Sequence, residues 1–293
     1  MFNFTLTNLY NGYSINNYFN QYISSRMHML KENIHFNQIA GTFPFNSWNG
    51  GLNGNYDKIP LNNDIMALFT ANQAHCIRMN FANLHIEECD FENNFNRLIL
   101  EYGANGSTII EVSNLKLYEW IKEKYPIYNK FVLSSNAWEV LDLTPEMLDV
   151  ILDNPDFILA TMPRQYAKNL EYLSQIRNKA KIEIEINPIC PMICNNFSNC
   201  LNHENLLQYE FSDNSNFAIC KKCFPYHANP QTLELEDLKK TYFPLGINHF
   251  RLAETPYTKI QTYFLFLIKY FIKPEYQMQA FEDGFITLFG GGN

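Results

Sequence analysis

The sequence predicts an α/β protein, a single (β/α)8 TIM-like barrel with a cysteine-rich insertion after a late strand. Short β-like runs alternate with helical stretches at a spacing of roughly 25 residues, which is typical of parallel strands joined by helical crossovers. About eight such runs can be counted, the number that a closed barrel needs. No linker rich in Pro or Ser divides the 293 residues, so we expect one domain over 1–293.

The strand candidates are short runs rich in Ile, Val and Phe. In chain order they are residues 38–43, 76–80, 107–112, 130–134, 156–161, 181–186 and 249–253. The eighth strand is either 2–6 or a stretch near 208–211. An open doubly wound sheet is the alternative architecture, but no Gly-rich phosphate motif follows the early strands.

Helix candidates lie between these strands. They are residues 62–71, 91–102, 115–124, 145–152 and 165–176. Pro145 directly after Thr144 is a good helix start, because proline fixes φ and lacks only an N–H that would have no partner in the first turn. The most apolar window, 263–272, is too short to span a bilayer and contains Lys269, so it predicts a buried helix on the sheet.

Composition narrows the class of protein. With 46% hydrophobic and 18% charged residues the chain is globular, and the net charge of −8 argues against general nucleic-acid binding. The N-terminus lacks the basic start and apolar stretch of a secretory signal, which favours the cytoplasm and no membrane partner.

Five of the seven cysteines fall between 190 and 223, directly after the strand 181–186. Their spacing is C-x3-C-x5-C-x19-C-x2-C, formed by Cys190, Cys194, Cys200, Cys220 and Cys223. In a reducing compartment, clustered thiols favour a metal over disulfides. Four thiolates suit a four-iron four-sulfur (4Fe-4S) cluster as well as zinc, and the spacing does not separate the two or choose four ligands from five. His203 and His227 flank the cluster as reserve ligands. We expect this insertion to span 188–242.

The strand before the cysteines carries acids on one face. Side chains alternate along a strand, so Glu183, Glu185 and Asn187 share a face opposite three isoleucines. In a barrel that face points inward, and buried carboxylates require cationic partners, a ligand or a role in proton transfer. The alternative is that Glu183 lies at a solvated strand start and only Glu185 is enclosed.

Further polar residues follow the carboxyl ends of other predicted strands, where barrel enzymes place their sites. They are Asn80, Glu111 with Asn114, Ser134 to Asn136, Thr161, and Arg251 with Glu254. Arg251 could neutralise an acid such as Glu185 or hold an anionic substrate. Any one of these residues could instead be a helix cap. Trp48, in a segment with adjacent glycines, could line the site or lie exposed in a tight turn.

Several segments, in order, resemble the barrel proteins related to peptidase family U32, the collagenase-like peptidases. The likeness is carried by Glu-Ile-Glu-Ile-Asn-Pro-Ile-Cys-Pro-Met-Ile-Cys at 183–194, and by stretches at 41–51, 111–114, 134–135 and 246–254. It covers roughly 41–254, most of the chain. The Gly-rich cysteine motif of the peptidases is not legible, and Asn195, Asn196 and Phe197 stand where the nearest relatives have basic residues.

The resemblance implies a TIM-like barrel that holds a 4Fe-4S cluster on four of the five clustered cysteines. It also implies oxygen-independent hydroxylation of a small aromatic or a nucleobase, and so a small-molecule or base substrate, with a protein partner as a further possibility. From their places at strand ends we expect Glu185, Asn187, Glu111 and Arg251 to be the catalytic residues lining the pocket. Two alternatives stay open. One is a U32-like peptidase; the other is a non-catalytic, zinc-stabilised barrel that acts as a partner subunit.

Overall fold

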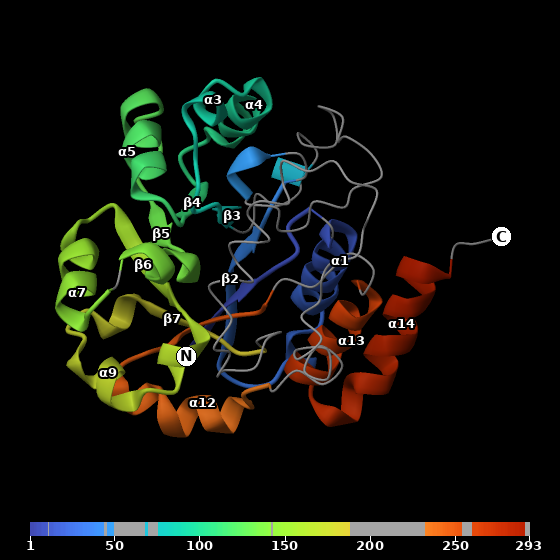
Figure 1. Ribbon diagram of the computed structural model, residues 1–293. Coiled ribbons are helices and arrows are strands. Elements are labelled where there is room, and N and C mark those ends of the chain that lie inside the picture. The colour runs from blue at the N-terminus through green and yellow to red at the C-terminus, as the bar shows by residue number, and fades with distance from the viewer. Residues whose placement is uncertain are drawn as a thin grey trace, which may run out of the picture.

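The chain forms a closed barrel of eight parallel strands surrounded by helices (Figure 1). The computed structural model describes residues 1–10, 12–43, 46–49, 68–69, 76–141, 143–187, 232–253 and 260–290. Each strand pairs with the next in sequence, and the last strand pairs with the first, which closes the barrel. The predicted (β/α)8 class is therefore confirmed.

Every predicted strand from 38–43 onward coincides with an observed strand, and the eighth is the stretch at the N-terminus. The strands are β1 (Phe2–Leu6), β2 (Ile34–Gly41), β3 (Cys76–Phe81), β4 (Ile109–Val112), β5 (Phe131–Leu133), β6 (Phe157–Met162), β7 (Ile182–Glu185) and β8 (His249–Arg251). The other candidate for the eighth strand, 208–211, lies outside the described residues.

Helices connect the strands on the outside of the barrel. They are α1 (Tyr13–Ser24), α3 (Glu88–Phe91), α4 (Asn94–Gly103), α5 (Leu115–Lys124), α6 (Trp138–Leu141), α7 (Pro145–Asp153), α8 (Arg164–Ala167), α9 (Leu170–Gln175), α12 (Leu235–Thr241), α13 (Ile260–Phe271) and α14 (Gln277–Phe289). Single 3-10 turns occupy Met27–Met29, Ser47–Asn49, Ser135–Ala137, Lys179–Lys181, Phe243–Leu245 and Pro274–Tyr276. Most of the predicted helix 62–71 lies outside the described residues.

Local capping explains where the predicted helices begin and where two of them divide. Thr144 accepts a hydrogen bond from the N–H of Met147, and Pro145 occupies the first turn, as predicted. The stretch predicted as one helix over 91–102 divides because the side chain of Asn93 caps a new helix, α4. Asn169 likewise caps α9 and separates it from α8. At these two positions an Asn side chain bonds backbone N–H groups and begins a new helix.

Aromatic packing holds α13 against the barrel. The ring of Phe271 lies 5.0 Å from Phe4 of β1 and 4.8 Å from Phe36 of β2, both edge-on. The predicted buried helix over 263–272 is thus confirmed. Helices α13 and α14 lie side by side next to α1, on the right of Figure 1. Within the described ranges, no helix is long and apolar enough to cross a membrane.

Trp48 is a core residue. It is fully buried in the Ser47–Asn49 turn, with its ring edge-on to Phe81 and Trp120 at 5.1 and 5.7 Å. The tight turn with an exposed Trp is therefore wrong, and the ring is covered by other aromatic residues rather than offered for stacking. Two aromatic neighbours that lie more than 30 residues downstream were not visible in the local pattern.

The part of the predicted insertion that the structure describes, 232–242, belongs to the helical layer of the barrel. Leu238 of α12 is fully buried, and the hydroxyl of Tyr242 donates to the carbonyl of Ala167 at 3.0 Å. The remainder of the insertion, including all five clustered cysteines, lies outside the described residues.

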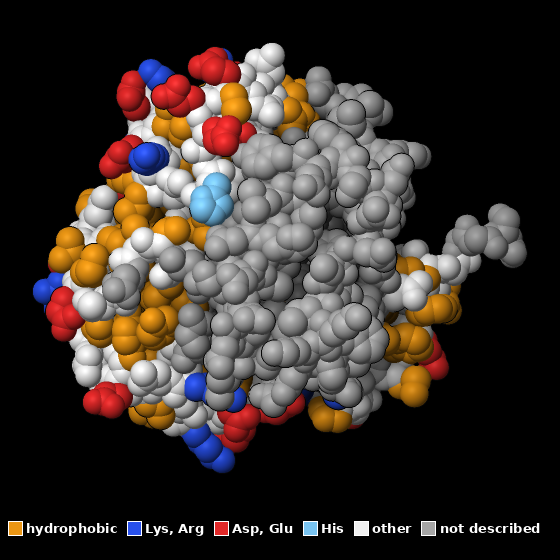
Figure 2. Space-filling model, viewed as in Figure 1, with side chains coloured by type: hydrophobic (Ala, Val, Ile, Leu, Met, Phe, Trp, Pro, Cys, Tyr) orange, Lys and Arg blue, Asp and Glu red, His pale blue; other side chains and the backbone are white. Residues whose placement is uncertain are grey.

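Helix α7 tests how the outer layer is held. Leu148 is fully buried, whereas its neighbour Met147 is 48% exposed. Figure 2 shows hydrophobic side chains on the left of the molecule, the side on which Figure 1 places α7. We expect Leu148→Ala to lower the free energy of unfolding by about 2–5 kcal/mol, because it removes buried methyl groups and leaves a cavity. Met147→Ala, measured by the same urea titration, should change it by less than about 1 kcal/mol. Equal effects would contradict the placement of α7.

Candidate active site

Charged side chains from strands on different sides of the barrel meet in its interior. Arg78 of β3, Glu111 of β4, Glu183 of β7 and Arg251 of β8 are each at least 95% buried. Only the inward face of a closed barrel lets these strands bring side chains into contact. Ile109, Val132 and Leu159 form a separate small apolar cluster of buried residues. The interior is therefore partly apolar and partly ionic, whereas barrel interiors are usually filled by branched aliphatic side chains.

Arg78 is fully buried, and every nitrogen of its guanidinium has a partner. Nε donates to Glu111 at 2.8 Å, and Nη1 donates to both oxygens of Glu183 at 2.9 and 2.7 Å. Nη2 donates to the hydroxyl of Thr161 at 2.7 Å, and Gln38 accepts a longer bond of 3.4 Å from Nη1. This arginine thus links four other strands from β3.

Glu183 is the matching anion. Besides Arg78, its carboxylate accepts hydrogen bonds from the hydroxyls of Thr5 and Thr161 at 2.7 and 2.8 Å. Burial acts to raise the pKa of Glu183, but the charges of Arg78 and Arg251 and these hydroxyls outweigh it and hold the pKa at about 2. Glu183 is therefore ionised at any physiological pH.

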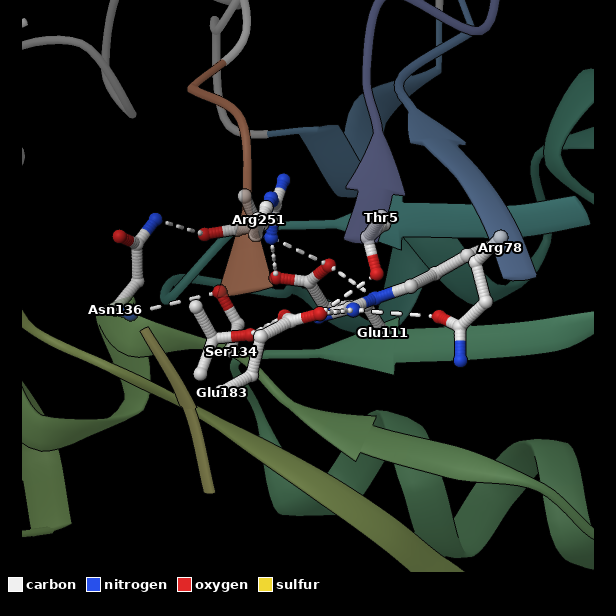
Figure 3. A network of polar contacts seen from close by, with 10 residues as sticks. Thr5, Arg78, Glu111, Ser134, Asn136, Glu183 and Arg251 are labelled. Carbon is white, nitrogen blue, oxygen red and sulfur yellow. Dashed lines mark hydrogen bonds and ion pairs between the residues drawn. The ribbon is translucent and has the colours of Figure 1, made fainter. Parts of the chain in front are cut away.

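Arg251 is paired on one side only. Its Nη1 donates to both oxygens of Glu111 at 2.7 and 2.8 Å, so Glu111 lies between two arginines. Burial acts to lower the pKa of Arg251, yet the charges of Glu111, Glu183 and Glu185 keep it raised. The buried Nε of Arg251 has no hydrogen-bond partner. Figure 3 shows one nitrogen of this guanidinium directed away from Glu111.

Two other buried polar atoms beside this network lack a partner. They are Oδ1 of Asn80 and Oγ of Ser113. Asn80 pairs in register with Glu111 and lies two residues beyond Arg78, and Ser113 lies two residues beyond Glu111. Because inward positions recur every second residue, both lie one step nearer the carboxyl ends of the strands than the residue they follow.

The predicted site residues have different surroundings. Glu111 and Arg251 lie together in the network, and Glu185 is half-buried, with its charge acting on Arg251. Asn187 is buried, and its Oδ1 accepts from the backbone N–H of Ala253 at 2.7 Å, which ties β7 to the end of β8. The main ion-pair partner of Arg251 is Glu111, whereas the sequence suggested Glu185.

The alternative for Glu183 is wrong, because this residue is fully buried and Glu185 is the more exposed of the two. Other polar residues at strand ends have structural contacts. Asn114 caps α5 and donates to the carbonyl of Leu84, and Asn136 donates to the hydroxyl of Ser134 and the carbonyl of Ala82. Glu254 lies outside the described residues.

Sequence reasoning missed Arg78, together with Thr5 and Gln38. The signal was present in the alternation, since Asn80 was placed at a strand end and Arg78 precedes it by two residues on the same face. Two inward acids also required cations, and Arg78 is the arginine on β3. His249 is a further interior residue, in register with Glu183, and burial lowers its pKa.

The cysteine segment is attached next to this site. The chain leaves β7 through Ile186 and Asn187 and is next described at residue 232, and the N–H of Leu233 donates to the carbonyl of Ile186 at 2.8 Å. Both ends of the segment therefore lie at the carboxyl end of β7. Among the described residues no group of three or more His, Cys, Asp or Glu could hold a metal ion. The two cysteines that the structure describes, Cys76 and Cys89, are free thiols.

The fold and the site together define a (β/α)8 barrel protein with two arginines and two glutamates ion-paired in its interior. The fold is similar to that of a solved structure titled "The Structure of the U32 Peptidase Mk0906", with a TM-score of 0.46 and 14% sequence identity over 74% of this chain and 85% of that chain. No protein-family model and no curated protein matches the sequence.

The ionic network makes a prediction about stability. Glu183→Gln removes the anion that Arg78 binds with two hydrogen bonds, and breaking a buried ion pair costs about 3–5 kcal/mol. We expect a loss of that size in the free energy of unfolding, measured by urea titration. Glu92→Gln, at an exposed pair with Arg97, should change it by no more than about 1 kcal/mol. A loss at Glu183 no larger than the one at Glu92 would contradict the network.

The lowered pKa of Glu183 also makes a prediction about pH. A carboxyl whose pKa is lower in the folded than in the unfolded chain stabilises the fold above its unfolded pKa and loses that effect as pH falls to its folded pKa. For Glu183 this window runs from 4.5 down to about 2. The wild-type protein should lose stability across it, and Glu183→Gln should lose less. Identical slopes in acid titrations of the two proteins would contradict the assignment.

Proposed function

We propose that this protein is an iron–sulfur (β/α)8 barrel enzyme that acts on a small molecule at the carboxyl end of its barrel. The observation that carries the proposal is the buried ionic network with an incompletely paired Arg251, at the end of the barrel where the cysteine segment is attached.

Stability does not explain the network. Removing two arginines and two glutamates from water costs several kcal/mol for each ion, and well-packed apolar side chains in their place are often neutral or stabilising. Arg78 and Glu183 satisfy one another, but Arg251 keeps a buried donor without a partner. Buried charges with incomplete partners concentrate at functional sites, because binding and proton transfer require them there.

The donor set of the cysteine segment fits a cluster. Cys190, Cys194, Cys200, Cys220 and Cys223 supply one thiolate more than a 4Fe-4S cluster needs, and these residues would hold it. Such a cluster, when bound, supplies one-electron transfer. The segment starts at Pro188, directly after Asn187, whose side chain bonds the backbone N–H of Ala253, two residues beyond Arg251.

We assign substrate binding, proton transfer and positioning to separate residues of the site. Arg251, held by Glu111, binds and orients an electron-rich group of the substrate. Glu185 is the least enclosed of the three interior acids, and we assign to it the role of accepting or delivering a proton. Asn187 fixes the ends of β7 and β8 relative to each other through the backbone of Ala253.

The reaction class that we propose is oxygen-independent hydroxylation of a small aromatic or a nucleobase, as the sequence resemblance implies. A U32-like peptidase and a zinc-stabilised partner subunit are the competing functions. The metal content of the protein and its association state in solution distinguish these two functions from the proposed one.

Metal analysis tests the proposal directly. Protein purified without oxygen should be brown and contain iron and acid-labile sulfide, measured together with the visible absorption spectrum. Cys190→Ser and Cys194→Ser should lose most of the iron. Cys89→Ser, an exposed thiol on α3 far from the segment in sequence, is the matched control and should retain it. A colourless protein with one equivalent of zinc would refute the cluster and favour the partner subunit.

A further inference from the structure

We propose that the substrate carries a carboxylate, and that this group binds the Nε and Nη2 edge of Arg251 with Asn80 and Ser113 beside it. The inference deepens the proposed function, since it names the chemical class of ligand at the same site. The residues that carry it all lie in the described part of the barrel.

A guanidinium offers two parallel donors along its Nε–Nη2 edge, which match the two oxygens of a carboxylate. The protein uses Arg251 differently. Only Nη1 contacts Glu111, at 2.7 and 2.8 Å, so the bidentate edge makes no hydrogen bond within the described residues. Arg78 provides the contrast, because all three of its nitrogens are bonded.

Because the Nε of this unused edge is buried, its lack of an acceptor indicates a missing partner. Arg251 is 5% exposed, and a buried donor without an acceptor costs about 1–3 kcal/mol or more when it carries charge. Arg251 stays charged, because three nearby acids raise its pKa. A donor of this kind is satisfied either by trapped water or by an anionic ligand, and a planar carboxylate satisfies both nitrogens at once.

Two neighbouring atoms require partners as well. Oδ1 of Asn80 and Oγ of Ser113 are buried without hydrogen bonds; Asn80 on β3 lies opposite Glu111, and Ser113 follows Glu111 by two residues. The hydroxyl of Ser113 can donate to the carboxylate of the ligand, whereas Oδ1 of Asn80 requires a donor elsewhere on the substrate. A ligand without polar atoms would leave both residues unsatisfied.

The local charge limits the ligand to a single negative charge, and the two charge-assisted bonds of the Nε–Nη2 edge are what favour a carboxylate over a neutral group. Arg78 and Arg251 are already balanced by Glu111 and Glu183, and Glu185 adds another negative charge acting on Arg251. One carboxylate gains two charge-assisted bonds there. A dianion such as inorganic phosphate brings more repulsion from the same acids and lacks the planar geometry, so the site should discriminate against it.

The test is to measure by titration calorimetry how tightly benzoate binds to the anaerobically purified protein. Benzamide has the same shape without the charge, and inorganic phosphate is the tetrahedral anion. We expect benzoate to bind with a Kd of about 10 mM or tighter, the weak limit for a ligand of nine heavy atoms. Benzamide and phosphate should bind at least about tenfold more weakly.

Variants locate the binding. Arg251→Lys keeps a cation for Glu111 but loses the planar edge, and should weaken benzoate binding about tenfold or more. Arg177→Lys, at an exposed arginine, is the matched control and should bind benzoate normally. Ser113→Ala tests whether benzoate binds at this site even if Arg251→Lys folds poorly. It should weaken binding a few-fold without lowering the melting temperature, because it removes a buried hydroxyl that has no partner.

The outcomes separate the inference from the proposed function. The carboxylate site would be overturned if benzoate did not bind with a Kd of about 10 mM or tighter. It would also be overturned if Arg251→Lys and Ser113→Ala bound benzoate as tightly as the wild-type protein does. Tighter binding of phosphate than of benzoate would also overturn it. Benzoate binding that depends on Arg251, in protein that contains no iron, would support the carboxylate site and refute the cluster.

Discussion

The interior of this barrel depends on the desolvated guanidinium of Arg78. A buried cation is tolerated only when each of its donors has an acceptor, and here two carboxylates, a threonine and a glutamine provide them from four different strands. Glu183 extends the same network to β1 through Thr5. The ion pairs therefore fix how strands far apart around the barrel face one another, which alternating aliphatic residues specify less sharply.

Glu111 joins two regions of different character. Its Oε2 accepts from both Arg78 and Arg251, at 2.8 Å in each case. On one side, Arg78, Glu183 and the threonines satisfy one another. On the other side, Arg251 keeps an unused edge and Glu185 is partly exposed. The paired side holds Glu111 in place, and Glu111 in turn holds Arg251, so a ligand binds a cation that is already desolvated and oriented.

The sequence was sufficient for the strands because hydrophobic runs and their alternation are local. It placed Glu183 and Glu185 on the inward face for the same reason. It did not identify Arg78, since a single arginine in Cys76–Phe81 is unremarkable until barrel closure brings β7 opposite it. Nor could it show that Arg251 pairs with Glu111, 140 residues away, or that Trp48 packs on Trp120. Contacts across a barrel depend on strand order and register, and the local sequence of a single segment determines neither.

The position of the unsatisfied atoms indicates which end of the barrel carries chemistry. Arg251 Nε, Asn80 Oδ1 and Ser113 Oγ border Glu111 rather than Glu183. If the network only stabilised the fold, apolar side chains of similar size at these positions would be more favourable, because each unsatisfied atom costs free energy in the folded state. These atoms are three of the nine buried side-chain atoms without a partner among the described residues, and a polar ligand that completed the network beside Glu111 would satisfy all three. Arg251, held in place by Glu111, would then bind the charge of that ligand.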